Sequence, residues 1–150
     1  MASFVNAADA IAAAVEIERR GRSFYLQAAE KALSADDKEF FSFMASEEER
    51  HESVFTNMLQ RIGGLPLPAG SSDAEYLAYV SDLLDSHTLF IPGLEERILH
   101  DPLLEAIKFE KDTLLFFNEL DGMVPDEERK YVRSCADEER KHIRMLLKRR

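Results

Sequence analysis

The ten residues SEEERHESVF, positions 46–55, place a histidine inside a run of charged residues. A closely similar stretch, DEERKHIRML, returns at positions 137–146. When the two are aligned, each holds a glutamate followed three positions later by a histidine, with a second glutamate directly before the first. The repeated spacing is formed by Glu48, His51, Glu139 and His142. A charged run is ordinarily a solvated helix face, and recurrence of the same acid–histidine spacing calls for a further reason.

Length and composition fit one helix-rich, soluble domain. The chain has 150 residues, of which 45% are hydrophobic and 32% charged. A chain of this size can bury a full core, and its composition differs from that of disordered chains. We therefore expect residues 1–150 to form a single domain.

The sequence also limits compartment and partners. No apolar run reaches membrane-spanning length, and the start MASFVNAADA lacks the features of a secretory signal. Cys135 is the sole cysteine, so no internal disulfide can form and a reducing cytoplasm is the expected location. The net charge of −10 argues against a nucleic-acid or anionic-membrane partner.

Helical periodicity and cap residues predict an all-α fold. No segment shows sustained two-residue alternation, so no sheet is expected. Ser34 and the pair Asp101-Pro102 are typical helix starts, and Gly63-Gly64 is a typical end. Long helices are predicted at about 6–33, 34–62, 101–122 and from 125 nearly to the C-terminus, with a short helix at about 72–85 and an irregular or briefly helical segment at 86–100. Two antiparallel hairpins joined by a long crossover make a four-helix bundle of ferritin-like connectivity.

Spacings of three and four residues place the repeated acids and histidines on buried helix faces. The two stripes are Phe41, Met44, Glu48, His51, Phe55, Met58 and Ile62, and Val132, Cys135, Glu139, His142 and Leu146. Glutamate and histidine therefore occupy positions where a bundle normally has apolar residues. The neighbours are expected on solvated faces: Glu47, Glu49, Arg50, Glu138, Arg140 and Lys141.

The first and third long helices repeat each other as well. AVEIERRGRSFY at 14–25 aligns with AIKFEKDTLLFF at 106–117. Glu18 matches Glu110, and each lies on an otherwise apolar or small-residue face. The chain thus reads as two copies of a helical hairpin. Each copy supplies one glutamate from its first helix and one Glu-x-x-His from its second.

Four buried carboxylates require compensating positive charge, because burial penalises each one and they repel one another. Two divalent cations would balance four carboxylates, and two neutral imidazoles would add ligands without charge. This shell lacks the thiolates of structural zinc sites and suits iron or manganese, in the combinations Fe/Fe, Mn/Fe or Mn/Mn. The sequence therefore predicts two metal ions per chain.

This residue set resembles the di-iron domain of rubrerythrins, within the ferritin-like superfamily, over about residues 5–147. The resemblance implies two bridging glutamates, Glu48 and Glu139, with the iron shell completed by Glu18, His51, Glu110 and His142. It also implies reduction of hydrogen peroxide, or oxidation of ferrous iron, at this centre. Tyr25, seven residues after Glu18, is expected either to hydrogen-bond a ligand carboxylate or donate an electron, or to be an ordinary core tyrosine.

Two features depart from the rubrerythrin pattern. Rubrerythrins proper carry a rubredoxin-like iron domain held by four cysteines, whereas these 150 residues contain one cysteine. Rubrerythrins also often have an extra glutamate three residues from the one in the third helix, where this chain has Ile107 and Thr113. We therefore expect electrons to come from a separate protein.

The predicted function is reduction of hydrogen peroxide or dioxygen at a di-iron centre. One alternative is an iron-handling protein that oxidises iron and passes it on, and another is a metal-stabilised structural bundle. The long crossover and short chain favour a homodimer over a ferritin-type cage. Cys135 is expected to be a buried, inert thiol, Gly21 to permit close helix packing, and His87 and His100 to lie on the surface.

Overall fold

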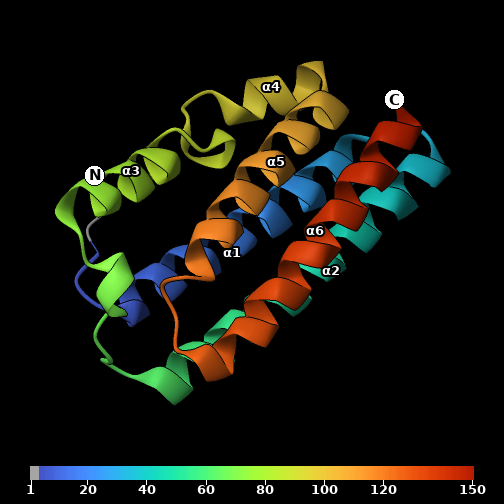
Figure 1. The fold of residues 1–150 in the computed structure, drawn as a ribbon. Coiled ribbons are helices and arrows are strands. Elements are labelled where there is room, and N and C mark those ends of the chain that lie inside the picture. Colours follow the sequence, from blue (N-terminus) through green and yellow to red (C-terminus); the bar gives the residue numbers. More distant parts are fainter. Residues whose placement is uncertain (1–3) are drawn as a thin grey trace.

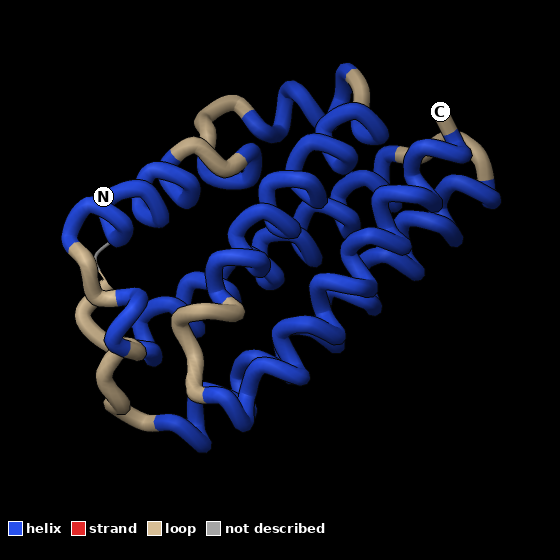
Figure 2. Tube along the Cα trace, viewed as in Figure 1, coloured by secondary structure: helices blue, strands red, loops and turns tan. Residues whose placement is uncertain are grey.

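The computed structural model describes residues 4–150 and is helical along most of that length (Figures 1 and 2). Four long helices form the bundle: α1 (Ala7–Lys31), α2 (Ala35–Ile62), α5 (Pro102–Leu120) and α6 (Arg129–Arg149). The crossover from α2 to α5 holds η1 (Ala69–Ser71), α3 (Ala74–Asp85), η2 (Thr88–Phe90) and α4 (Leu94–His100), and η3 (Asp126–Glu128) precedes α6. No strand is formed by residues 4–150, so the predicted fold class is confirmed.

Side-chain caps explain where four of the six α-helices within residues 4–150 begin. The Ser34 hydroxyl accepts a hydrogen bond from the Asp37 N–H at 3.0 Å, and α2 begins directly after Ser34. The Asp101 carboxylate likewise accepts from the Leu104 N–H at 3.0 Å, and Pro102 is the first residue of α5. Each cap satisfies an N–H group that a helix start leaves without an intrahelical partner.

Two predicted helix starts were wrong by a few residues. The short helix α3 begins after Asp73, whose carboxylate accepts from the Tyr76 N–H at 3.0 Å, and not at Ser72. The last helix does not begin at Pro125, because the next three residues form the tighter turn η3 and α6 begins at Arg129.

Two aromatic layers pack the bundle core. At one end, Phe24 and Tyr25 of α1 lie against Phe109 of α5, with ring centroids 4.9 and 5.2 Å apart respectively. At the other end, Phe55 of α2 meets Phe117 of α5 at 5.1 Å. All five rings are fully buried. The predicted acid cluster lies between the two layers: the Tyr25 hydroxyl of the first layer reaches Glu110 at 2.7 Å, and Phe55 and Phe117 of the second layer lie seven residues, about two helical turns, after Glu48 and Glu110.

The crossover lies along α1 and α5 (Figure 1). His87 is buried there, at 1% exposure, so the prediction of a surface histidine was wrong. Its Nδ1 accepts from the Leu89 N–H at 3.1 Å, and its Nε2 lies 2.9 Å from the Thr113 hydroxyl of α5. Burial lowers the His87 pKa to about 4, so this imidazole is neutral. His100 is exposed, as predicted.

None of the helices within residues 4–150 combines the length and the apolar character needed to cross a membrane.

Candidate metal centre

The six predicted ligands meet inside the bundle, and each is at most 2% exposed. They form two overlapping groups, in each of which one potential ligand atom per residue lies within 4.8 Å of the others. One group is Glu18, Glu48, His51 and Glu139, and the other is Glu48, Glu110, Glu139 and His142. Glu48 and Glu139 belong to both groups, which is the placement needed to bridge two metal ions.

Helix geometry explains how the sequence gathers these groups. Residues at i and i+3 are neighbours on one helix face, so α2 and α6 each present a glutamate and a histidine together. Gly21 of α1 leaves the room for one of them, because a Cβ added there would lie 3.1 Å from Glu48 Oε2. The predicted role of Gly21 in close packing thus becomes a specific one: it accommodates the Glu48 carboxylate.

Many buried side-chain atoms of the cluster have no hydrogen-bond partner. Buried atoms without a hydrogen bond include both oxygens of Glu18, both oxygens of Glu139, one oxygen each of Glu48 and Glu110, and Nδ1 of His51 and His142. No Lys or Arg side chain within residues 4–150 is buried. Arg22, at the edge of this face, instead pairs with Glu52 at 2.9 Å. An uncompensated set of hard oxygen and imidazole donors fits two divalent cations.

The outer ring nitrogens of the two histidines face carboxylates from the opposite hairpin. His51 Nε2 lies 2.8 Å from Glu138 Oε2, and His142 Nε2 lies 3.6 Å from Glu47 Oε1. Each of these glutamates directly precedes a glutamate of the cluster. The prediction that Glu47 and Glu138 are simply solvated was wrong, because both side chains are only 23% exposed and turn toward the neighbouring helix.

Arg50 contacts both outer carboxylates, Glu47 and Glu138. Its guanidinium donates to Glu47 at 3.3 Å and also donates to Glu138, so one arginine joins the two outer carboxylates. Arg50 itself is exposed, as are Glu49, Arg140 and Lys141, in agreement with the prediction.

The outer carboxylate also defines which nitrogen of His51 can bind a metal. A carboxylate at Nε2 favours the tautomer in which that nitrogen carries the proton and donates it. The Nδ1 lone pair then points into the cluster, where Glu139 Oε1 lies 2.8 Å away and Glu18 Oε2 lies 3.7 Å away. Lone pairs that converge at these distances repel unless a proton or a cation lies between them. The donor geometry therefore fits a metal ion.

The metal-free cluster has strongly perturbed acidities. Burial, together with the charge of neighbouring glutamates, raises the pKa of Glu18 and Glu48 well above the usual range and that of Glu110 to about 8. Burial alone would lower the pKa of the histidines, but the adjacent carboxylates more than offset it and raise the values to about 10 for His51 and about 11 for His142. Without metal, the cluster therefore holds protons in place of cations.

Tyr25 hydrogen-bonds the cluster directly. Its hydroxyl donates to Glu110 Oε1 at 2.7 Å, and both groups are fully buried. Burial and the charge of Glu110 raise the Tyr25 pKa well above its usual value, so the phenol keeps its proton. The corresponding residue of the second hairpin is Phe117, which cannot form such a bond. The two halves of the centre therefore differ in their surroundings.

Two further residues near the cluster behave as inert groups. Cys135 is buried, and burial raises its pKa to about 12, in agreement with the prediction of an unreactive thiol. Thr113 is one of the two positions three residues from Glu110, where the rubrerythrin resemblance implies an extra carboxylate. Its hydroxyl donates to the Phe109 carbonyl at 2.7 Å and meets His87, so this position offers no charged ligand.

Comparisons with known proteins agree with this geometry. Residues 9–81 match the sequence profile of the Rubrerythrin family. A protein from Thermotoga maritima, provisionally described as a ferritin-like diiron-carboxylate protein, superposes with a TM-score of 0.65 at 23% identity, over 95% of this chain and 93% of that one. A hypothetical protein from Pyrococcus furiosus superposes with a TM-score of 0.67 at 23% identity, over 96% of this chain and 87% of that one. No curated protein matches. The chain therefore has the ferritin-like fold of these two structures, and residues 9–81 are similar to the Rubrerythrin family.

Proposed function

We propose that this protein is a non-haem di-iron oxidoreductase that reduces hydrogen peroxide, or dioxygen, with electrons from a separate donor protein. The observation that carries the proposal is the pair of overlapping Glu/His groups with their unpartnered, buried donor atoms. The match to the rubrerythrin profile and the description of the Thermotoga maritima protein support the choice of iron over manganese.

Two ferrous ions would supply the two electrons that, with two protons, convert hydrogen peroxide to two water molecules. The residues of this chain would hold and isolate such a pair. Glu48 and Glu139 belong to both groups and would hold both ions, the outer carboxylate of Glu138 would orient His51, and Glu47 lies 3.6 Å from His142 Nε2. The four carboxylates are at most 2% exposed, so bulk water has little access to them.

Tyr25 is the proton-bearing group that touches the proposed ligand shell. Its hydrogen bond to Glu110 orients that carboxylate and partly neutralises its charge. Because the second hairpin has Phe117 at the equivalent position, only the Glu110 side has this donor. We propose Tyr25 as a positioning residue for Glu110.

The compartment, the assembly and the partners proposed for this protein are those expected from its sequence. A reducing cytoplasm is the compartment that the single buried Cys135 favours. We propose a homodimer as the assembly. Peroxide or dioxygen would be the small-molecule partner, and the electron donor would be the protein partner.

One anaerobic experiment tests the proposed reaction. The iron-loaded, fully reduced protein should consume about one equivalent of peroxide per centre and then stop, and a reduced rubredoxin should restore turnover. A protein that instead releases ferric iron to a chelator and turns over with fresh ferrous iron and no donor would be an iron-handling protein. A protein that holds metal but reacts with neither oxidant would be a structural bundle.

A further inference from the structure

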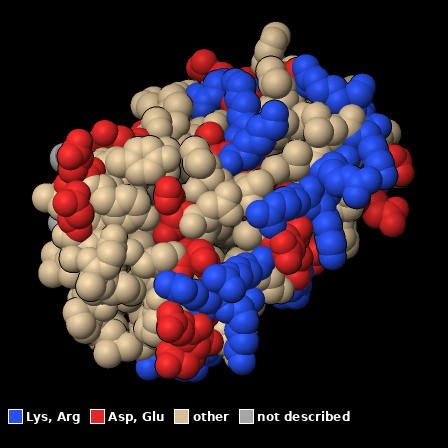
Figure 3. All heavy atoms as spheres, in the orientation of Figure 1, with Lys and Arg blue, Asp and Glu red and all other residues tan. Residues whose placement is uncertain are grey.

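Charge is distributed very unevenly along the chain. Residues 129–150, which are essentially helix α6, contain nine Lys or Arg and three Asp or Glu, for a formal charge of +6. The other 128 residues therefore carry −16 of the total of −10. Figure 3 shows Lys and Arg gathered over the face that α5 and α6 form. A basic face on an acidic protein marks where a partner of opposite charge would bind.

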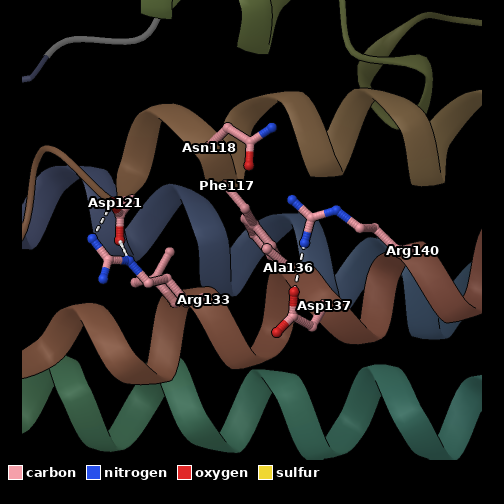
Figure 4. Close-up of a pocket in the computed structure, with 8 residues that line it drawn as sticks. Phe117, Asn118, Asp121, Arg133, Ala136, Asp137 and Arg140 are labelled. Atoms are coloured by element: carbon pink, nitrogen blue, oxygen red, sulfur yellow. Dashed lines mark hydrogen bonds and ion pairs between the residues drawn. The ribbon is translucent and has the colours of Figure 1, made fainter.

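Several of these cations already have partners within the fold. Arg133 pairs with Asp121 at 2.9 Å and Arg140 pairs with Asp137 at 2.6 Å, on either side of a hollow of about 320 Å³ between α5 and α6 (Figure 4). Arg149 pairs with Asp37 at 2.6 Å, which ties the end of α6 to the start of α2. The charges of these side chains are thus partly compensated within the fold, so they offer less free positive charge to a partner.

Lys130 lies over the Tyr131 ring, 5.1 Å from its centroid, and three further cations on α6 have no ion-pair partner within residues 4–150. Lys141, Arg144 and Lys148 are exposed, and none forms an ion pair within residues 4–150. Spacings of three and four residues place them along one side of the helix, and we call them the basic stripe. Leu147, which is 51% exposed, adjoins the stripe. An apolar spot beside unpaired charge is a common composition for a protein-binding surface.

The basic stripe lies over the metal centre. Lys141 directly precedes His142, and Arg144 follows that histidine by two residues. The histidine points into the bundle and the two cations point to solvent, so the stripe and the cluster are on opposite sides of one helix. An α-helix with its side chains is about 10–12 Å across. A redox group bound at the stripe would therefore be separated from the centre by little more than one helix.

We propose that the basic stripe is the docking surface for an acidic one-electron carrier protein. This inference rests on the proposed function, which needs an external source of electrons. Each docking event would pass one electron from the carrier to the oxidised centre, and two events would return the centre to its reduced state for one molecule of peroxide. The oxidised carrier would then dissociate.

A protein partner suits the stripe better than a nucleic acid does. A phosphate backbone that extended beyond α6 would meet the surface of residues 1–128, which together carry a net charge of −16. A compact acidic protein can instead bind the stripe and Leu147 alone.

Binding of an acidic rubredoxin, measured by titration calorimetry and by NMR on the purified protein, tests the docking independently of turnover. The reversal variant Lys141→Glu/Arg144→Glu/Lys148→Glu should lose at least about tenfold in affinity at low salt. Lys31→Glu is the control, because Lys31 is exposed on α1 and forms no ion pair within residues 4–150. The milder variant Lys141→Gln/Arg144→Gln/Lys148→Gln, checked by circular dichroism, should show a smaller loss in the same direction.

Stopped-flow oxidation of reduced rubredoxin by the metal-loaded protein provides the kinetic readout. The wild-type rate should fall as salt increases, whereas the reversal variant should be slow at all salt concentrations and retain its metal. Equal binding and equal rates in wild type and variant would overturn the proposal. Stripe-dependent binding of a DNA oligonucleotide without rubredoxin binding would also overturn it. Failure to consume peroxide, with stripe-dependent rubredoxin binding intact, would refute the proposed reaction and leave the docking surface supported.

Discussion

His51 Nε2 lies 2.8 Å from Glu138 Oε2, so a histidine of the first hairpin is oriented by a carboxylate of the second. The mirrored pair, His142 and Glu47, is looser at 3.6 Å. The His51–Glu138 contact therefore joins the two hairpins in addition to the buried cluster. Loss of such an outer partner typically lowers metal affinity by about 10- to 100-fold.

Glu138→Ala should weaken metal binding by about that factor without unfolding the protein, because the imidazole loses the group that fixes its tautomer. Glu47→Ala should have a smaller effect, since its contact is longer. Glu49→Ala is the matched control, being exposed and one helix position from the cluster. Competition titrations with a coloured chelator measure all three. Equal affinity in Glu138→Ala and Glu49→Ala would show that the outer carboxylate does not position the histidine.

Gly21→Ala should reduce metal affinity while leaving the helix intact. Alanine in a helix interior is normally favourable over glycine by about 0.5–1 kcal/mol. Here the new Cβ would lie 3.1 Å from Glu48 Oε2, so the carboxylate that belongs to both groups must move. Thermal melts of the metal-free protein and metal titrations separate the two effects. Ser23→Ala, at an exposed position of the same helix, should change neither appreciably.

The metal-free protein should lose stability as pH rises from about 6.5 to 8.5. Folded-state pKa values are raised for Glu110, to about 8, and for His51 and His142, to about 10 and 11. A group with a raised folded-state pKa gives stability that is present below its unfolded-state value and is lost as pH rises through the folded one. Melting temperatures across this range, measured with chelator present, test the expectation. A rise in melting temperature toward pH 8.5 would contradict it.

Below about pH 6.5, protonation of His87 makes the stability of the folded protein fall as pH decreases. The His87 pKa is lowered to about 4, so its contribution to stability is present above about 6.5 and is lost as pH falls toward 4. The effect of the Glu/His cluster on stability is therefore best measured between neutral and alkaline pH, where His87 does not titrate.

Chelation should lower the melting temperature at neutral pH. Metal that binds only the folded state stabilises it by about 2.7 kcal/mol at a hundredfold excess over the dissociation constant. The carboxylates of the emptied site also repel one another. Differential scanning calorimetry with and without chelator measures the change. An unchanged melting temperature would mean that these acids do not share a metal.

Local signals in the sequence were sufficient for the fold and for the six-residue cluster. Ser34 and Asp101 cap helices as their residue types predict, and spacings of three and four identify buried faces even where the residue is Glu or His. The repeated hairpin then pairs helices that are far apart in the chain. These features depend on one helix at a time, or on a symmetry visible in the sequence itself.

Contacts between elements were harder to predict. Glu138 appeared to lie on a solvated face because its partner, His51, is 87 residues away on a neighbouring helix. The one available signal was the glutamate doublet before each histidine spacing, which recurs in both repeats. The sequence around His87 does not indicate that the crossover folds against α5, so this histidine was predicted to be exposed. In the structure its Nε2 lies 2.9 Å from the Thr113 hydroxyl of α5. In both cases tertiary packing decides the environment.

Metal content of the purified protein tests the central claim most directly. Elemental analysis of wild type should give two ions per chain, because four buried carboxylates balance two divalent charges. Glu48→Ala and Glu139→Ala should lose metal to a comparable degree, since each residue belongs to both groups, and Glu49→Ala should retain it. A well-folded wild type that holds one metal ion or none would contradict the account, as would loss of metal in Glu49→Ala with retention in Glu48→Ala.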